Sequence, residues 1–285
     1  AHRELDRALA ADHLAVDQIH EQIADLEPQR RVAAAAAQQR IGADVLKASD
    51  ALNVFELEAI AKRNIPVAHF GYLSGGVLDD RTVQSNRQAF DAWGLRARRL
   101  IDVSKIDLSI KLFGQTLSSP VILSPVSSQR AFHADGETAV ARAAGKRNAL
   151  QILSGLTTVS LEDVMAAHGG QVWQQLYTTN RPETSLKIAS RADTAGAGAL
   201  ECSSCHRQGA GYDFSRKKMF DGLDMTGVFS PTSSALTWDF IARIRDVTKK
   251  RLLLKGIMTA EDAGIAVKRG VDGIIVSNHG GRAEE

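Results

Sequence analysis

The sequence predicts an α/β fold, a (β/α)8 barrel with an N-terminal helical arm, from three observations. From residue 121 onward, short apolar runs of strand length alternate with helical stretches, as in parallel strand–helix units. Most successive runs begin 21–29 residues apart, which suits one strand and one helix in each unit. Polar side chains gather just after the apolar runs, where α/β enzymes place their sites.

The amino-acid composition argues against several classes of protein. The chain has 285 residues, with 44% hydrophobic and 24% charged, which is enough apolar material for one large core or two smaller ones. Lys and Arg total 35 against 33 Asp and Glu, so the net charge of +2 argues against a dedicated nucleic-acid binder. No apolar run reaches the roughly 18 residues that span a bilayer. Two cysteines are too few for a disulfide scaffold.

An N-terminal helical arm is predicted over residues 1–52. Apolar residues recur every three to five positions from Leu5 to Leu26, which fits one face of a helix. Pro28 interrupts this pattern, and the Ala-rich stretch Val32–Leu46 predicts a second helix. We expect the arm to pack on the body or on another subunit, and the barrel domain to occupy residues 53–285.

The elements after the arm follow in order. Asn53 with Glu56 resembles a capping box that opens a short helix, and another helix is predicted over Asp80–Trp93. Six strand–helix units come next, and the fourth connection is long because its runs begin at 198 and 252. The predicted strands are Val121–Leu123, Leu150–Leu153, Val172–Leu176, Gly198–Leu200, Leu252–Leu254 and Gly273–Val276. The predicted helices are Glu137–Arg147, Ser160–Ala167, Pro182–Ser190, Thr237–Lys249 and Thr259–Arg269.

Two architectures fit this alternation. An open doubly wound sheet would favour a glycine-rich phosphate loop after its first strand, but the first run continues into S-P-V-S-S at 124–128. A (β/α)8 TIM barrel has eight units, of which about six are present in this sequence. Since an isolated six-unit sheet would leave open strand edges, we expect the protein to continue past Glu285.

The segment S-N-H-G-G-R at 277–282 carries the clearest chemistry. Its glycines let the backbone approach a flat ligand, His279 can take a proton near neutral pH, and Arg282 can grip a carboxylate with two hydrogen bonds. No metal site is predicted, because His69 and His133 lack paired ligands. The other strand-end candidates are Pro125, Val126 and Ser127, then Ser154, Gln175, Tyr177, Lys255 and Ser277.

The chain from Asn53 to Glu285 resembles the FMN-dependent 2-hydroxy-acid dehydrogenases and oxidases. This family includes L-lactate dehydrogenase, glycolate oxidase and mandelate dehydrogenase. The resemblance rests on S-N-H-G-G-R at 277–282, L-L-L-K-G at 252–256, Q-L-Y at 175–177 and S-P-V-S at 124–127, with Y-L-S-G at 72–75 and L-T-W-D-F at 236–240 in support.

The resemblance implies FMN as cofactor and oxidation of a small L-2-hydroxy acid, such as L-lactate, to the 2-oxo acid. It implies His279 as the base, Arg282 as the carboxylate clamp and Tyr177 as a substrate contact that stabilises charge. Lys255 would lie beside the pyrimidine edge of the flavin, where a cation stabilises the anionic reduced form. Backbone or side-chain flavin contacts are implied for Pro125, Val126, Ser127, Ser154, Gln175, Ser277 and His279.

The chain departs from the family pattern at three places. A substrate tyrosine of the family falls on Gly71, and Tyr72 matches its neighbour. A residue-by-residue match puts Ser203 where the family has the Asp that pairs with the catalytic His, but our hypothesis is that a segment is absent between Leu200 and Glu201. The glycine and arginine motifs that grip the FMN phosphate in the seventh and eighth units do not occur.

Other interpretations stay open at the level of sequence. Cys202 and Cys205-His206 fit a C-x-x-C-H haem c signature, but a disulfide, a two-thiol metal site or chance also fit. A differently acting FMN barrel, for example one resembling isopentenyl-diphosphate isomerase, and a catalytically silent flavin-binding barrel are the rival functions. The electron acceptor could be oxygen, a quinone or a cytochrome. We expect a homo-oligomer in the cytoplasm or at a membrane, or in the periplasm if the haem is attached.

Overall fold

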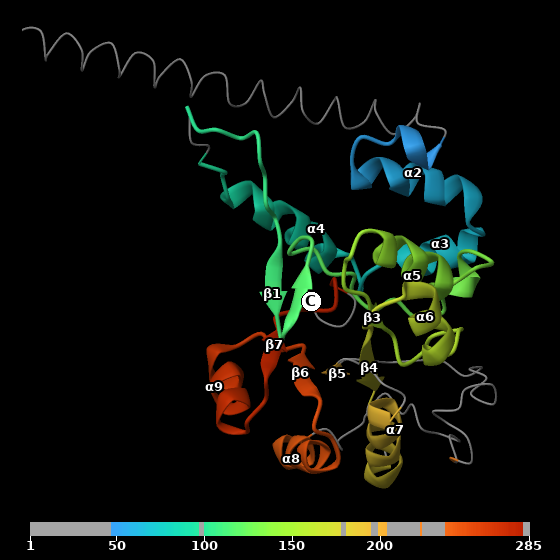
Figure 1. Ribbon diagram of the computed structural model, residues 1–285. Coiled ribbons are helices and arrows are strands. Elements are labelled where there is room, and N and C mark those ends of the chain that lie inside the picture. Colours follow the sequence, from blue (N-terminus) through green and yellow to red (C-terminus); the bar gives the residue numbers. More distant parts are fainter. Residues whose placement is uncertain are drawn as a thin grey trace, which may run out of the picture. The chain divides into compact units, whose positions relative to one another are not determined.

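The computed structural model describes residues 47–96, 100–177, 181–194, 199–203, 223 and 237–281. It divides into two units, Ala1–Phe70 and Gly71–Glu285, and each is described by itself. Figure 1 gives the order of the elements in both. The two helices predicted for the N-terminal arm lie outside the described residues. None of the helices within the described ranges is both long and apolar enough to cross a membrane.

The predicted cap is present in the first unit, although Glu56 accepts from the backbone N–H of the residue before the N-cap and not from that of the N-cap itself. Helix α2 (Val54–Asn64) follows a short 3-10 turn, η1 (Ala48–Asp50). Asn53 Oδ1 accepts hydrogen bonds from the backbone N–H groups of Phe55 at 2.9 Å and Glu56 at 3.2 Å. Glu56 Oε2 in turn accepts from the backbone N–H of Leu52 at 2.8 Å. The cap therefore satisfies donors that the first helical turn would otherwise leave without partners.

Two helices, a 3-10 turn and a β-hairpin come first in the part of the chain that leads to the main sheet. Helix α3 (Val67–Ser74), which crosses the boundary between the units, was not predicted. Helix α4 (Arg81–Gln88) with the 3-10 turn η2 (Ala89–Ala92) confirms the helix predicted over 80–93. The antiparallel hairpin β1 (Ile110–Leu112) and β2 (Gln115–Leu117) was also missed.

The hairpin turn explains why the pattern gave no signal. Its two central residues, Phe113 and Gly114, both have positive φ, at 47° and 83°. Such a two-residue turn is usually marked by Asn-Gly or Asp-Gly, because these residues tolerate the left-handed region. Phenylalanine at the first position removes that mark.

Five parallel strands form the main sheet, in the order β3-β4-β5-β6-β7. The first predicted strand contributes a single parallel bridge, from Leu123 to Gln151 next to β3. Spatial order thus follows sequence order from the first run to the sixth. A doubly wound sheet reverses its order at a switch point, and the described strands contain no reversal. The singly wound arrangement is the one found in barrels. The bounds are β3 (Ile152–Leu153), β4 (Trp173–Tyr177), β5 (Ala199–Ser203), β6 (Arg251–Lys255) and β7 (Gly273–Ile275).

All five predicted helices after the first strand are confirmed. Three of them begin at a hydroxyl cap, where Ser160, Thr237 and Thr259 each accept a hydrogen bond from the backbone N–H three residues ahead, at 3.1–3.2 Å. The helices are α5 (Glu137–Lys146), α6 (Leu161–His168), α7 (Pro182–Thr194), α8 (Trp238–Val247) and α9 (Ala260–Lys268).

Strand alternation divides the core into two clusters. Leu153, Leu176 and Leu254 pack with buried side chains of the helices, including Val164 and Ile244. The neighbouring strand positions point to the other face, because successive side chains alternate. There Ile152, Trp173 and Leu253 form a second cluster with Leu117 and Leu150, and partly buried hairpin residues such as Phe113 pack against it. We call this second side the inner face of the sheet.

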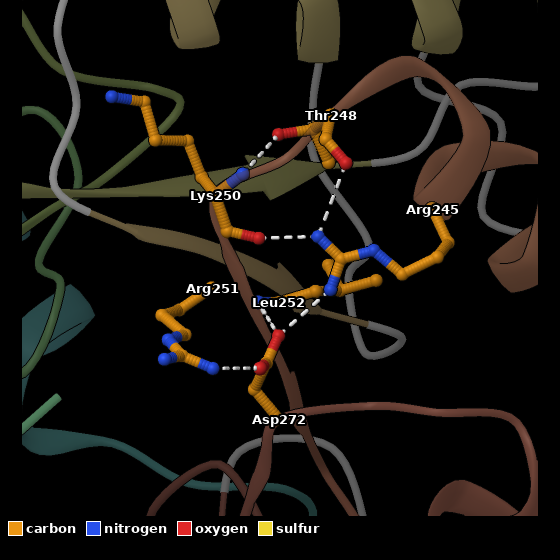
Figure 2. Close-up of polar contacts among 6 residues, drawn as sticks. All are labelled: Arg245, Thr248, Lys250, Arg251, Leu252 and Asp272. Carbon is orange, nitrogen blue, oxygen red and sulfur yellow. Dashed lines mark hydrogen bonds and ion pairs between the residues drawn. The ribbon is translucent and has the colours of Figure 1, made fainter.

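The carboxylate of Asp272 connects the residues at which β6 and β7 begin (Figure 2). Its oxygens lie 2.7 Å from Arg245 and from Arg251, and one oxygen also accepts from the backbone N–H of Leu252 at 2.9 Å. Arg245 further donates to the backbone carbonyls of Thr248 and Lys250. Because these contacts lie where the strands begin, they join α8 to the sheet away from the candidate site.

We expect Asp272→Asn to lower the free energy of unfolding by about 1–3 kcal/mol at pH 7, because both arginines lose their counter-charge. Burial of Asp272 alone would raise its pKa, but hydrogen bonds from Leu252, Arg251 and Arg245 and the charge of Arg245 outweigh burial and lower it. A lowered folded pKa gives stability that is present above the unfolded pKa and is lost as pH falls through the folded pKa.

Urea unfolding at pH 7 and at pH 3 measures this. The difference in free energy of unfolding between the parent and Asp272→Asn should shrink as the pH falls. Asp246→Asn is the matched control, since Asp246 is an exposed carboxylate on α8. An equal difference in free energy of unfolding at both pH values would contradict the link between the lowered pKa of Asp272 and stability.

A second stability prediction concerns the contact of α5 with α6. A Cβ at Gly145 would overlap the backbone oxygen of His168 and stand 3.0 Å from its carbonyl carbon. We expect Gly145→Ala to lower the free energy of unfolding by about 1–3 kcal/mol, despite the higher helix propensity of alanine. Gly264→Ala in α9 is the control, because that Cβ would meet no atom within 4 Å and should stabilise by about 0.5–1 kcal/mol. Equal midpoints for the two variants in urea would refute the close contact.

Candidate active site

The strand-end residues share the inner face with the second core cluster. Alternate residues of a strand point to the same face of the sheet. The inner-face residues Ile152, Trp173, Leu253 and Ile275 are therefore followed, two or four positions later, by the last inner-face residue at the end of each of these strands. Because the strands are parallel, these positions meet at one edge of the sheet. The residues brought to this edge are Ser154, Gln175, Tyr177, Lys255 and Ser277. The side chains of Ser154, Gln175 and Lys255 are almost wholly buried.

Lys255 and His279 form the central contact of the site. Lys255 Nζ lies 3.0 Å from His279 Nδ1, and Lys255 is only 8% exposed. A lysine ammonium has N–H donors and no acceptor, so Nδ1 is the acceptor in this contact. The proton of the neutral imidazole is then on Nε2. The structure therefore brings together two residues to which the resemblance gives separate roles at one site.

The loop that carries His279 has an unusual backbone. His279, Gly280 and Gly281 have φ values of 59°, 70° and 75°, so three successive residues occupy the left-handed region. For a non-glycine residue this conformation costs about 1–2 kcal/mol. A hydrogen bond of 3.0 Å from the backbone N–H of His279 to Ser277 Oγ supports the turn locally. The two glycines thus serve the close turn that the sequence predicted.

The same loop is held against α4 and the residues just before it by contacts that the sequence does not reveal. Asn86 and Asn278 exchange two side-chain hydrogen bonds, of 3.1 Å and 2.7 Å. The backbone N–H of Val77 also donates to the carbonyl of Gly281 at 3.0 Å. A Cβ at Gly281 would stand 2.6 Å from the backbone nitrogen of Val83. An asparagine inside a predicted helix gives no signal of such a contact, because its partner lies 192 residues away.

A buried carboxylate joins the two loops predicted to contact the flavin. Glu137 is fully buried and accepts from the backbone N–H groups of Gln129 at 3.2 Å and Thr158 at 2.8 Å, and from Thr158 Oγ1 at 2.5 Å. Ser128 donates from its backbone to the carbonyl of Leu156 at 3.1 Å. Glu137 was missed because it resembles an ordinary acidic residue in the first turn of a helix.

The residues of the first loop predicted to contact the flavin differ in how far they are buried. Ser127 is buried, and its hydroxyl lies 3.4 Å from the Tyr72 hydroxyl. Pro125 is half-buried and Val126 is exposed. Gly71 lies in α3 just before Tyr72, whose ring stacks on Phe132 with centroids 6.4 Å apart.

Strand β5 runs without a break through Leu200 and Glu201 and pairs along its length with both neighbours. This register places Ser203 opposite Tyr177 and Lys255, at the position where the family pattern has its Asp. Cys202 lies inside the same strand.

Three predicted residues lie outside the described part of the chain. They are Arg282, Cys205 and His206. Among the residues that are described, no group of three or more His, Cys, Asp or Glu side chains could hold a metal ion.

The donor set suits the polar edge of a flavin. The pyrimidine edge of an isoalloxazine ring presents carbonyl oxygens and ring nitrogens, which need both donors and acceptors. Ser154 and Gln175 offer both, and Lys255 adds a buried cation at the same edge of the sheet. Fold and site together define an α/β enzyme with a strand-end site for a planar cofactor.

Comparison with known proteins agrees with this class. The family model for FMN-dependent dehydrogenases matches residues 61–204 and 205–285. The chain belongs to the FMN-dependent dehydrogenase family. The predicted resemblance, the predicted cofactor and the classification as a flavin oxidoreductase are therefore confirmed.

Relatives and solved structures lie in the same group. The chain is 34% identical over 251 residues to a peroxisomal (S)-2-hydroxyacid oxidase GLO3 of Arabidopsis thaliana, covering 81% of this chain and 69% of that protein. It is 34% identical over 253 residues to glycolate oxidase 1 of Zea mays, with the same coverage. A mandelate oxidase structure superposes with a TM-score of 0.68 at 33% identity, covering 80% and 68% of the two chains. Another, solved with an FMN adduct, has a TM-score of 0.67.

Proposed function

We propose that this protein oxidises a small L-2-hydroxy acid, such as L-lactate, to the 2-oxo acid with FMN as its cofactor. The observation that carries the proposal is the buried Lys255 ammonium 3.0 Å from His279 at the strand ends. The names of the relatives, which are 2-hydroxy-acid, glycolate and mandelate oxidases, support the substrate class. We further propose that this sheet belongs to an eight-unit (β/α) barrel built around the site.

Each group has a separate part in the proposed reaction. FMN, when bound, accepts the two electrons that leave the C2 carbon of the substrate. Arg282 holds the substrate carboxylate by two parallel hydrogen bonds, and Tyr177 stabilises charge at the substrate oxygen. His279 accepts a proton as C2 is oxidised. Lys255 stabilises negative charge at the pyrimidine edge of the cofactor.

The Lys255–His279 contact sets one condition on this sequence of events. A neutral imidazole has one N–H and one lone pair, and the lone pair of Nδ1 is engaged by Lys255. His279 can accept a proton only when that contact opens. Reorientation of Lys255 toward the cofactor would open it and would also place the cation where charge develops. Cofactor binding and activation of the base are then one rearrangement.

The test is anaerobic stopped-flow mixing of the FMN-loaded protein with L-lactate, glycolate, L-mandelate and, as stereochemical control, D-lactate. We expect bleaching of the flavin absorbance by at least one L-2-hydroxy acid or glycolate and none by D-lactate. If no 2-hydroxy acid bleaches the flavin, the chain is a catalytically silent or differently acting FMN barrel and the proposal fails.

The acceptor is tested in the same preparation. The relatives named above are oxidases, which supports oxygen as the acceptor. Mixing the reduced protein with oxygen, a soluble quinone or cytochrome c compares the three reoxidation rates. We expect hydrogen peroxide to form with oxygen; reoxidation only by the quinone or the cytochrome would overturn this assignment.

A further inference from the structure

Resting on the proposed function, we infer that Asn86 of α4 is a positioning residue for His279. Asn86 touches neither the base nor Lys255 in any contact described above. It acts through the pair of hydrogen bonds that it shares with Asn278, the residue immediately before His279. We call these two hydrogen bonds the asparagine clasp.

The clasp is reciprocal and specific for two amides. Asn86 Nδ2 donates to Asn278 Oδ1 at 3.1 Å, and Asn278 Nδ2 donates to Asn86 Oδ1 at 2.7 Å. Both side chains are half-buried, which limits competition from water. A primary amide donates from one atom and accepts at another, as this pair of reciprocal hydrogen bonds requires. A hydrophobic or charged residue at position 86 therefore cannot replace it.

Asn278 passes this restraint directly to the base. Besides the clasp, its Oδ1 accepts from the backbone N–H of Gly281 at 3.3 Å, and its carbonyl accepts from the same N–H at 3.1 Å. Asn278 thus closes the turn that contains the left-handed His279. Internal bonds define the shape of the turn, whereas the clasp defines where the turn lies on the body.

Position matters because a base must lie within hydrogen-bond reach of the proton that it takes. Misplacement of a catalytic group by about 1 Å costs about 10²-fold in rate in other enzymes. After removal of the Asn86 side chain, one backbone hydrogen bond, from the N–H of Val77 to the carbonyl of Gly281, still holds the loop. We therefore expect the loop to remain attached but loosely placed.

The experiment compares Asn86→Ala with Gln84→Ala in the full FMN-loaded chain, since Gln84 lies on the same helix with an exposed side chain. We expect Asn86→Ala to reduce the rate of flavin bleaching about 10- to 100-fold with KM changed less than threefold. FMN content should stay unchanged. In an Asn278→Ala background, Asn86→Ala should have almost no further effect, because the clasp is already broken.

A second readout separates this inference from the proposed function. Nitrogen NMR of 15N-histidine-labelled protein reports the ring of His279 among the eight histidines, and His279→Gln assigns it. Asn86→Ala should shift or broaden the Nδ1 resonance of His279, and Gln84→Ala should not. If no 2-hydroxy acid bleaches the flavin of the parent protein, the proposed function fails, but this spectrum still tests the clasp.

One further variant guards against a general folding defect. Asn86→Asp keeps an acceptor for Asn278 Nδ2 but sets a second carboxylate oxygen against Asn278 Oδ1, so we expect a loss like that of Asn86→Ala at parental thermal stability. An unchanged ring resonance and a bleaching rate within twofold of the parent, in both Asn86 variants, would overturn the inference.

Discussion

Replacement of His279 by glutamine should slow flavin bleaching by L-2-hydroxy acids about 10²- to 10⁴-fold, the range expected for loss of a positioned base. Glutamine keeps a polar side chain of similar reach but cannot take the proton. The FMN content should remain parental, because Ser154, Gln175 and Lys255 are unchanged at the strand ends. Single-turnover absorbance measurements under anaerobic conditions give both quantities.

His133→Gln is the matched control for this prediction. His133 is exposed, and its Nδ1 accepts a hydrogen bond from the backbone N–H of Asp135 at 3.2 Å. We expect parental bleaching in this variant. Turnover of His279→Gln within threefold of the parent would remove His279 from the role of base.

Replacement of Lys255 by methionine has the second large effect. The change removes a buried positive charge while keeping an unbranched side chain of similar volume. Loss of one preorganised charge in a catalytic site costs about 10²- to 10³-fold. We expect a loss of this size in flavin reduction, a weaker affinity for FMN and a more negative reduction potential of the bound flavin, because the anionic reduced form loses its cation.

The potential distinguishes this role from simple packing. Lys268→Met removes an exposed lysine at the end of α9 and should leave the potential, the affinity and the rate unchanged. If Lys255→Met binds FMN more weakly but keeps the parental potential, Lys255 is a packing residue and its electrostatic role is refuted.

Much of the fold could be predicted from local pattern. The helices α5 to α9 begin at hydroxyl caps or helix-favouring stretches, and the strands β4, β6 and β7 are short apolar runs. These signals depend on residues within one or two turns of each other, so the sequence displays them directly. The hairpin β1–β2 was missed because Phe113 stands where a turn-favouring residue is usual.

The site could be predicted where strand ends supply its residues. Ser154, Gln175, Tyr177 and Lys255 lie at such ends, and parallel pairing brings strand ends to one edge. The supports of the site could not be predicted. Asn86 and Glu137 act through partners in other elements, and pairing across the fold leaves no trace in local periodicity. A resemblance to a family names the reacting groups more readily than the side chains that hold them.

The asparagine clasp joins positions 192 residues apart, whereas each strand pairs with the next in the chain. On a ribosome, strands can therefore add one after another as they emerge, yet the loop bearing the base cannot dock until position 278 has been released. Closing so long a loop is entropically costly and slow compared with pairing adjacent units. The scaffold is then assembled before it acquires reactivity, and a nascent chain can fold extensively while still chemically inert.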